Sequence, residues 1–142
     1  MSNTIKLKKG LNLPLKGEAE KKVLMEIKPD IIALKPTDFK GLIPKLLVKE
    51  GDTVKAGSPL FADKMCQDIL FTSPVSGTVQ NVVRGDKRKL LAVLVKADEN
   101  QVSENFGENK IADMSADQIK ALLLRSGLWG SIIQRPYGII AD

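Results

Sequence analysis

The chain has 142 residues, of which 43% are hydrophobic and 27% charged, and its formal net charge is +5. This composition is ordinary for a folded protein, and the length allows one domain, or one small domain with part of another. The sequence contains no histidine, which excludes Ser–His and Cys–His nucleophile systems and most zinc sites. The single cysteine, Cys66, cannot form an internal disulfide.

The basic excess is small and mostly dispersed, with one true cluster at residues 87–89. Nucleic-acid-binding domains usually combine denser basic clusters with stacking aromatic residues, and aromatic residues make up only 4% of this chain. We therefore expect no nucleic-acid partner and interpret the lysines as a solvated surface. A face directed at anionic lipid or at an acidic partner is the alternative.

The N-terminal region, 1–39, is expected to contribute strands that pack on the rest of the protein. Residues 5–10 alternate apolar and basic side chains, which is typical of a half-buried strand. Residues 23–27 form a short apolar run that predicts a second strand. Pro29, Pro36 and Pro44 argue against a helix across this region. No run approaches the roughly 18 apolar residues of a membrane-spanning helix, and the first residues lack an apolar signal region.

Residues 40–97 consist of short β-type runs separated by turn residues. Gly51–Asp52, Gly57–Pro59, Ser73–Gly77 and Arg84–Asp86 are the expected turns. The pattern predicts a small all-β module.

The C-terminal part changes character. Residues 98–114 are polar without an apolar period and are interpreted as a linker. Ser115 and Gln118 have the spacing of a capping box, which predicts a helix that ends near Gly127. Trp129, the only tryptophan, needs a surface to bury against. We expect 115–142 to be a helix and the start of a truncated second domain.

The stretch from Val48 to Leu60 resembles lipoyl- and biotin-carrier domains, because it fits V-x-x-G-D-x-V-x-x-G-x-P-L. Carriers attach their prosthetic group to a hairpin lysine about eight residues before a turn proline, since the hairpin arms pair in register. Lys64 lies ten residues before Pro74, and Cys66 occupies the carrier spacing. We therefore predict that Lys64 is an unmodified surface lysine; the alternative is a biotin or lipoate carrier with Lys64 as its attachment site.

The sequence offers no set of residues able to catalyse a reaction. Cys66 lacks a histidine or a second cysteine to activate it, so we expect an inert thiol. Gly127 to Gly130 does not fit the dinucleotide-binding pattern, and it follows a predicted helix rather than a strand. We expect no catalytic residue, no metal site and no cofactor in this chain.

Taken in order, the motifs resemble the A subunit of the sodium-translocating NADH:quinone reductase. The resemblance covers nearly the whole chain and is specific as an ordered set. Members of that family are much longer, so it implies an N-terminal fragment. The motifs are K-K-G-L-N-L-P at residues 8–14, L-V-K-E-G-D at 47–52, L-F at 60–61, F-T-S-P-V-S-G-T-V at 71–79, R-G-D-K-R at 84–88, S-G-L-W at 126–129 and R-P at 135–136.

The resemblance implies a mainly β, α+β fold: a barrel-sandwich hybrid (biotinyl/lipoyl-like) module, flanked by extra strands and followed by a second domain. It also implies a peripheral subunit on the cytoplasmic side of the bacterial inner membrane, within a complex that moves electrons from NADH to ubiquinone and pumps sodium. The flavins and iron–sulfur centre of that complex belong to other subunits. This region would act as a scaffold that docks on the other subunits, with ubiquinone as a possible neighbour and membrane contact only through them.

Overall fold

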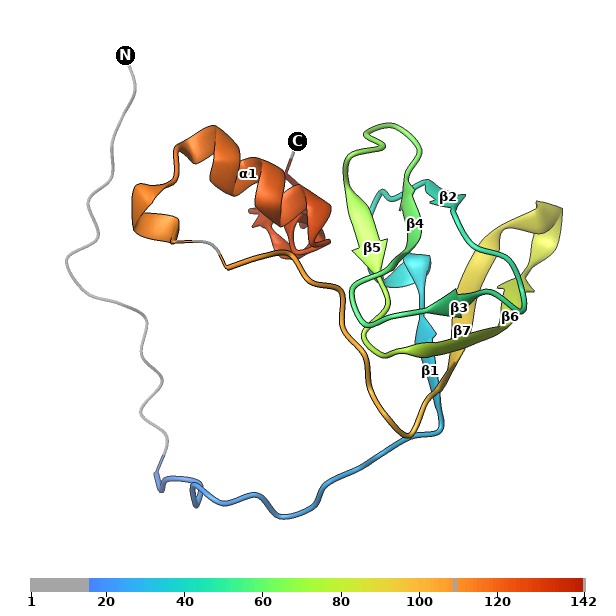
Figure 1. Cartoon of the computed structure of the whole chain (residues 1–142), viewed down its shortest axis with the longest axis horizontal. Helices are drawn as coiled ribbons and strands as arrows, with labels where there is room; N and C mark the ends of the chain where they lie inside the picture. Colours follow the sequence, from blue (N-terminus) through green and yellow to red (C-terminus); the bar gives the residue numbers. More distant parts are fainter. Residues whose placement is uncertain (1–15, 109, 142) are drawn as a thin grey trace.

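The computed structural model describes residues 16–108 and 110–141. Most of its regular elements are short strands, and one α-helix, α1, stands between β7 and β8 in the chain (Figure 1). A four-stranded antiparallel sheet has the order β1–β7–β6–β3, a three-stranded sheet has the order β2–β4–β5, and β8 pairs with β9. The bounds are β1 Ile31–Leu34, β2 Pro44–Leu46, β3 Thr53–Val54, β4 Pro59–Asp63, β5 Leu70–Thr72, β6 Gly77–Arg84, β7 Leu90–Ala97, α1 Ala116–Arg125, β8 Ile133–Gln134 and β9 Ile139–Ile140.

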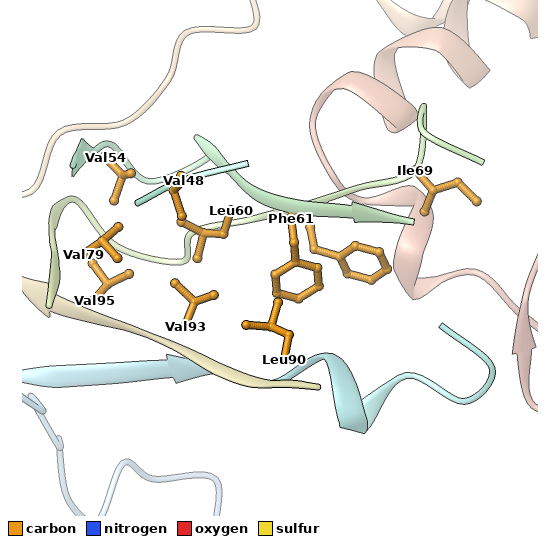
Figure 2. Packing of buried hydrophobic residues seen from close by; sticks show 10 residues of the cluster. Val48, Val54, Leu60, Phe61, Ile69, Val79, Leu90, Val93 and Val95 are labelled. Carbon is orange, nitrogen blue, oxygen red and sulfur yellow. The ribbon is translucent and has the colours of Figure 1, made fainter. Parts of the chain in front are cut away.

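The hydrophobic core lies between the two larger sheets (Figure 2). Phe61 and Leu60 of β4 and Val93 of β7 are completely buried, and Val79 and Val95 are 1% exposed. Leu60 and Phe61 are neighbours in the chain, yet both are buried, at the point where the register of β4 with β5 shifts. The expected mainly β fold with one helix, a barrel-sandwich hybrid, is confirmed.

The Gly51–Asp52 turn illustrates why turn chemistry recurs in this module. Gly51 has φ +91°, a left-handed backbone that glycine adopts without steric cost. Its N–H donates to the Val79 carbonyl at 2.8 Å, and the Val79 N–H donates to the Asp52 carbonyl at 2.8 Å. The Asp52 carboxylate also accepts from the Lys49 N–H at 2.7 Å. The turn therefore joins the β3 side of the module to β6.

The prediction of a strand at residues 23–27 is wrong, because this segment forms no strand and is exposed to solvent. Val23 is 89% exposed and Leu24 83% exposed. Its apolar residues are consecutive rather than alternating, so they offer no single face to bury. Instead β1, at residues 31–34, joins the four-stranded sheet by antiparallel pairing with β7. The strand expected at 5–10 lies outside the described residues.

The polar stretch that follows β7, interpreted as a linker, is fastened to the β module by hydrogen bonds. The Ala56 N–H donates to the Val102 carbonyl at 2.9 Å, and the Glu104 N–H donates to the Ala56 carbonyl at 2.8 Å. The Gln101 side chain accepts from the Ser76 N–H at 2.8 Å. Two of these hydrogen bonds join backbone groups, which every residue type carries, so the side-chain pattern of the sequence gave no sign of them.

Helix α1 begins and ends as the sequence predicts. The Ser115 hydroxyl accepts from the Gln118 N–H at 3.3 Å, and the Gln118 side chain accepts from the Ser115 N–H at 2.9 Å, which completes the capping box. Gly127 follows the helix with φ +76°. None of the described helices is long and apolar enough to cross a membrane.

The segment after α1 packs on the β module. Leu124 and Trp129 contact the core cluster, and the Trp129 indole N–H donates to the Ala141 carbonyl at 2.7 Å. A Cβ added at Gly127 would lie 2.6 Å from Thr72 Cγ2, so this glycine permits close approach of the chain to β5. Trp129 therefore finds its surface within the described chain.

We expect Gly127→Ala to lower the free energy of unfolding by about 2–4 kcal/mol, measured by urea denaturation. About 1–2 kcal/mol comes from the left-handed backbone, and the rest from the clash with Thr72. Gly51→Ala is the matched control, because Gly51 also has positive φ but an added Cβ there would meet no atom within 4 Å. Equal losses in the two variants would contradict the proposed packing of Gly127 on β5.

Candidate functional site

The hairpin between β4 and β5 is the place where carrier domains bear their prosthetic group. Phe61 pairs with Phe71, and Ala62 with Leu70. The Asp63 N–H then donates to the Ile69 carbonyl at 3.0 Å and closes the ladder. Residues 64–68, here called the hairpin loop, are exposed beyond this last pair.

Lys64 and Cys66 occupy different parts of the hairpin loop. Lys64 is its first residue, and its N–H donates to the Ile43 carbonyl at 2.8 Å, so its backbone is held against the chain that precedes β2. Cys66 lies midway between Asp63 and Ile69 and is exposed at the apex. The structure thus places the cysteine where the carrier spacing would place a lysine.

The hairpin loop is braced from one side by the β2 strand. The Lys45 ammonium donates to the Gln67 side-chain oxygen at 2.7 Å. Within the loop, the Met65 N–H donates to the Asp63 carboxylate at 2.9 Å. Met65 itself is 79% exposed. The loop therefore has a defined backbone and presents Met65 and Cys66 to solvent.

The other side of the hairpin is covered by aromatic and C-terminal residues. The ring of Phe71, on β5, lies 4.5 Å from that of Phe39 and 5.0 Å from that of Phe61. A Cβ added at Gly130 would lie 2.9 Å from the Phe71 ring, so the chain after α1 runs directly over this phenylalanine. Sequence reasoning missed this contact; the close spacing of Gly127 and Gly130 around Trp129 was its only signal.

The hairpin loop and α1 also form the two walls of an open groove. The hairpin side contributes Gln67, Asp68 and Leu70, and the helix contributes Ala121, Leu124 and Arg125. The Arg125 guanidinium is held by the Phe106 carbonyl at 3.1 Å. The groove contains no nucleophile–base pair, and among the described residues no group of three or more His, Cys, Asp or Glu could hold a metal ion.

A second notable feature is the turn between β6 and β7, where the sequence has its basic cluster. Lys87 and Arg88 have φ of +53° and +62°, and the Gly85 N–H donates to the Lys89 carbonyl at 2.8 Å. Positive φ at both central residues defines the mirror-image hairpin turn that normally uses Asn–Gly. Each non-glycine residue in this conformation costs about 1–2 kcal/mol. The sequence indicated the charge but not the strained backbone.

Comparison with known proteins agrees with this geometry. The family model described as "NqrA N-terminal barrel-sandwich hybrid domain" matches residues 5–98. Curated relatives, each named as the A subunit of Na(+)-translocating NADH-quinone reductase, include those of Neisseria meningitidis serogroup A, 37% identical over 96% of this chain, and Pseudomonas aeruginosa, 36% identical over 97%. The protein of that name from Glaesserella parasuis is 36% identical over 94% of this chain.

The chain spans about a third of the length of these relatives, 31% for the N. meningitidis protein and 32% for the P. aeruginosa protein. The matched region includes the two larger sheets and the hairpin loop, and it ends before α1 and the β8–β9 pair. The resemblance inferred from the ordered motifs is confirmed: the chain belongs to the family of the NqrA N-terminal barrel-sandwich hybrid domain.

Proposed function

We propose that this chain is the non-catalytic N-terminal part of the A subunit of a sodium-pumping complex that transfers electrons from NADH to ubiquinone. It acts there as a scaffold, and the hairpin loop docks on another part of the same subunit or complex. The observation that carries this proposal is the hairpin itself. Its loop is braced by Ile43 and Lys45, and its apex bears Cys66 instead of a lysine.

The names of the relatives support the assembly. Each is named as the A subunit of a Na(+)-translocating NADH-quinone reductase, which is a multi-subunit enzyme. Under this proposal the chain is peripheral, on the cytoplasmic side of the inner membrane, and reaches the bilayer region through partner subunits. NADH, flavins and the iron–sulfur centre are used by other subunits, while ubiquinone is the one small molecule that this subunit would lie near.

Exposed apolar residues on the hairpin loop support docking rather than a solvated tip. Met65 is 79% exposed, and it stands beside Cys66, which is also exposed. Methionine is flexible and adapts to irregular apolar surfaces, so it suits a protein contact. A carrier hairpin would need its apex free to visit several active sites, whereas a docking hairpin needs one fixed partner.

The docking proposal is tested by photo-crosslinking. A benzophenone maleimide attached to Cys66, the only cysteine in the chain, should crosslink to another part of the complex when the chain is assembled within its full-length subunit, together with the other subunits. The matched control combines Cys66→Ser with Gln80→Cys, which moves the label to an exposed position on β6. An assembled complex without crosslinks from Cys66 would overturn the docking role.

The carrier alternative is tested by intact mass after expression with biotin and lipoate ligases. We expect the unmodified mass, because Lys64 begins the hairpin loop instead of occupying its apex. As a positive control, Asp63→Met combined with deletion of Gln67 and Asp68 restores the biotin motif M-K-M and the carrier spacing, and should gain biotin. A cofactor mass on the parent chain that disappears in Lys64→Ala would establish the carrier function instead.

A further inference from the structure

The β6–β7 turn carries four basic side chains on one exposed tip. Arg84, Lys87, Arg88 and Lys89, here called the basic turn, are all exposed. In the described part of the chain none of them takes part in a salt bridge. Asp86 is the one acidic residue in the turn. The basic turn projects from the side of the molecule opposite to α1 (Figure 1).

The strained backbone of the basic turn indicates that its side chains have a functional role. Lys87 and Arg88 occupy the two positive-φ positions, where asparagine and glycine would be less strained. Local strain of this kind persists where surrounding structure imposes it, and it concentrates at functional sites. The Arg84 guanidinium donates to the Arg88 carbonyl at 3.3 Å and helps to hold this conformation. The fold alone needs a turn here, but not a basic one.

We propose that the basic turn binds the anionic phospholipid headgroups of a bilayer surface. The turn projects from the module (Figure 1), so it can reach a flat surface, and its four exposed cations can meet several phosphates at once. Residues 84–89 include no apolar or aromatic side chain, although buried aromatic anchors usually supply the energy of protein–protein contacts. The absence of stacking aromatic residues likewise argues against nucleic acid. Electrostatic attraction to an anionic membrane needs only clustered Lys and Arg near the surface.

This inference goes beyond the proposed assembly, in which partner subunits alone bring the chain to the membrane. The lipid-binding inference rests on the proposed function in one respect only: assembly into the membrane complex would place this chain close to a bilayer. Vesicle binding is measured without other subunits, and crosslinking from Cys66 is measured within the complex. Failure of one therefore leaves the other standing.

The test is sedimentation of the whole 142-residue chain with phosphatidylcholine vesicles that contain or lack phosphatidylglycerol. Binding should require phosphatidylglycerol, and it should be lost near 1 M salt, where the Debye length falls to about 3 Å from about 10 Å at 0.1 M. A triple variant should bind the vesicles more weakly, with a vesicle–water partition coefficient lower by roughly fivefold for each cation removed. It combines Lys87→Gln, Arg88→Gln and Lys89→Gln.

The matched control removes the same charge elsewhere. The control variant combines Lys21→Gln, Lys22→Gln and Lys28→Gln. These three lysines precede β1, and each forms a salt bridge with a nearby glutamate. This triple variant should bind almost as well as the parent chain. Equal losses in the two triple variants would show that net charge, and not the basic turn, governs binding and would overturn the proposal.

A third variant separates the role of the side chains from that of the backbone. Lys87→Gly with Arg88→Gly should unfold at a higher urea concentration, because glycine adopts positive φ without strain. The same variant should bind vesicles more weakly. If the double glycine variant keeps full vesicle binding, the proposal fails. The proposal is also overturned if variants of the basic turn bind vesicles normally but no longer assemble with the other subunits. In that case the partner of the basic turn is an acidic protein surface and not lipid.

Discussion

The packing of Phe71 between Phe39, Phe61 and the chain at Gly130 is the interaction on which this structure depends most. Phe61 is completely buried in the core, and Phe71 stacks on it with a ring distance of 5.0 Å. Phe39 lies in the segment between β1 and β2 and meets the ring of Phe71 edge-on, with 4.5 Å between the two ring centroids. Aromatic residues bury large areas, and such pairs add to the energy of burial. One side chain therefore joins the β sheets, the segment before β2 and the segment after α1.

This contact has a direct consequence for function. In a carrier domain the hairpin leaves its apex free, with the modified lysine extended into solvent. Here β5 lies beneath the C-terminal segment, and Lys45 and Ile43 hold the loop from the other side. The same fold is thus compatible with a docking element, since a hairpin fixed at its base can present Met65 and Cys66 in a constant orientation.

Local sequence signals predicted those parts of the fold that depend on local physics. The capping box at Ser115 and Gln118 and the Gly51–Asp52 turn are determined by neighbouring residues, and both occur as expected. The two additional residues before Pro74 put Cys66, and not Lys64, at the carrier spacing, and in the structure Cys66 stands at the hairpin apex. The carrier-like pattern and the ordered motifs were sufficient for the fold class and the family.

Features that depend on distant contacts could not be predicted. The apolar run at 23–27 has strand-forming residues, but no strand of the described chain pairs with it. The path of the chain over Phe71 requires Gly130, whose role is visible only when both segments are placed in space. The positive φ of Lys87 and Arg88 contradicts their usual preference, so no propensity argument would have assigned it.

The most direct test of this account uses Trp129, whose indole is bonded to Ala141 and whose ring lies against the core cluster. Urea unfolding should be followed by Trp129 fluorescence and by far-UV circular dichroism in the same samples. If Phe71 unites the β module and the segment after α1, the two signals change in one coincident transition. A Trp129 transition at clearly lower urea than the loss of β structure would show that the two parts fold separately and would contradict the account.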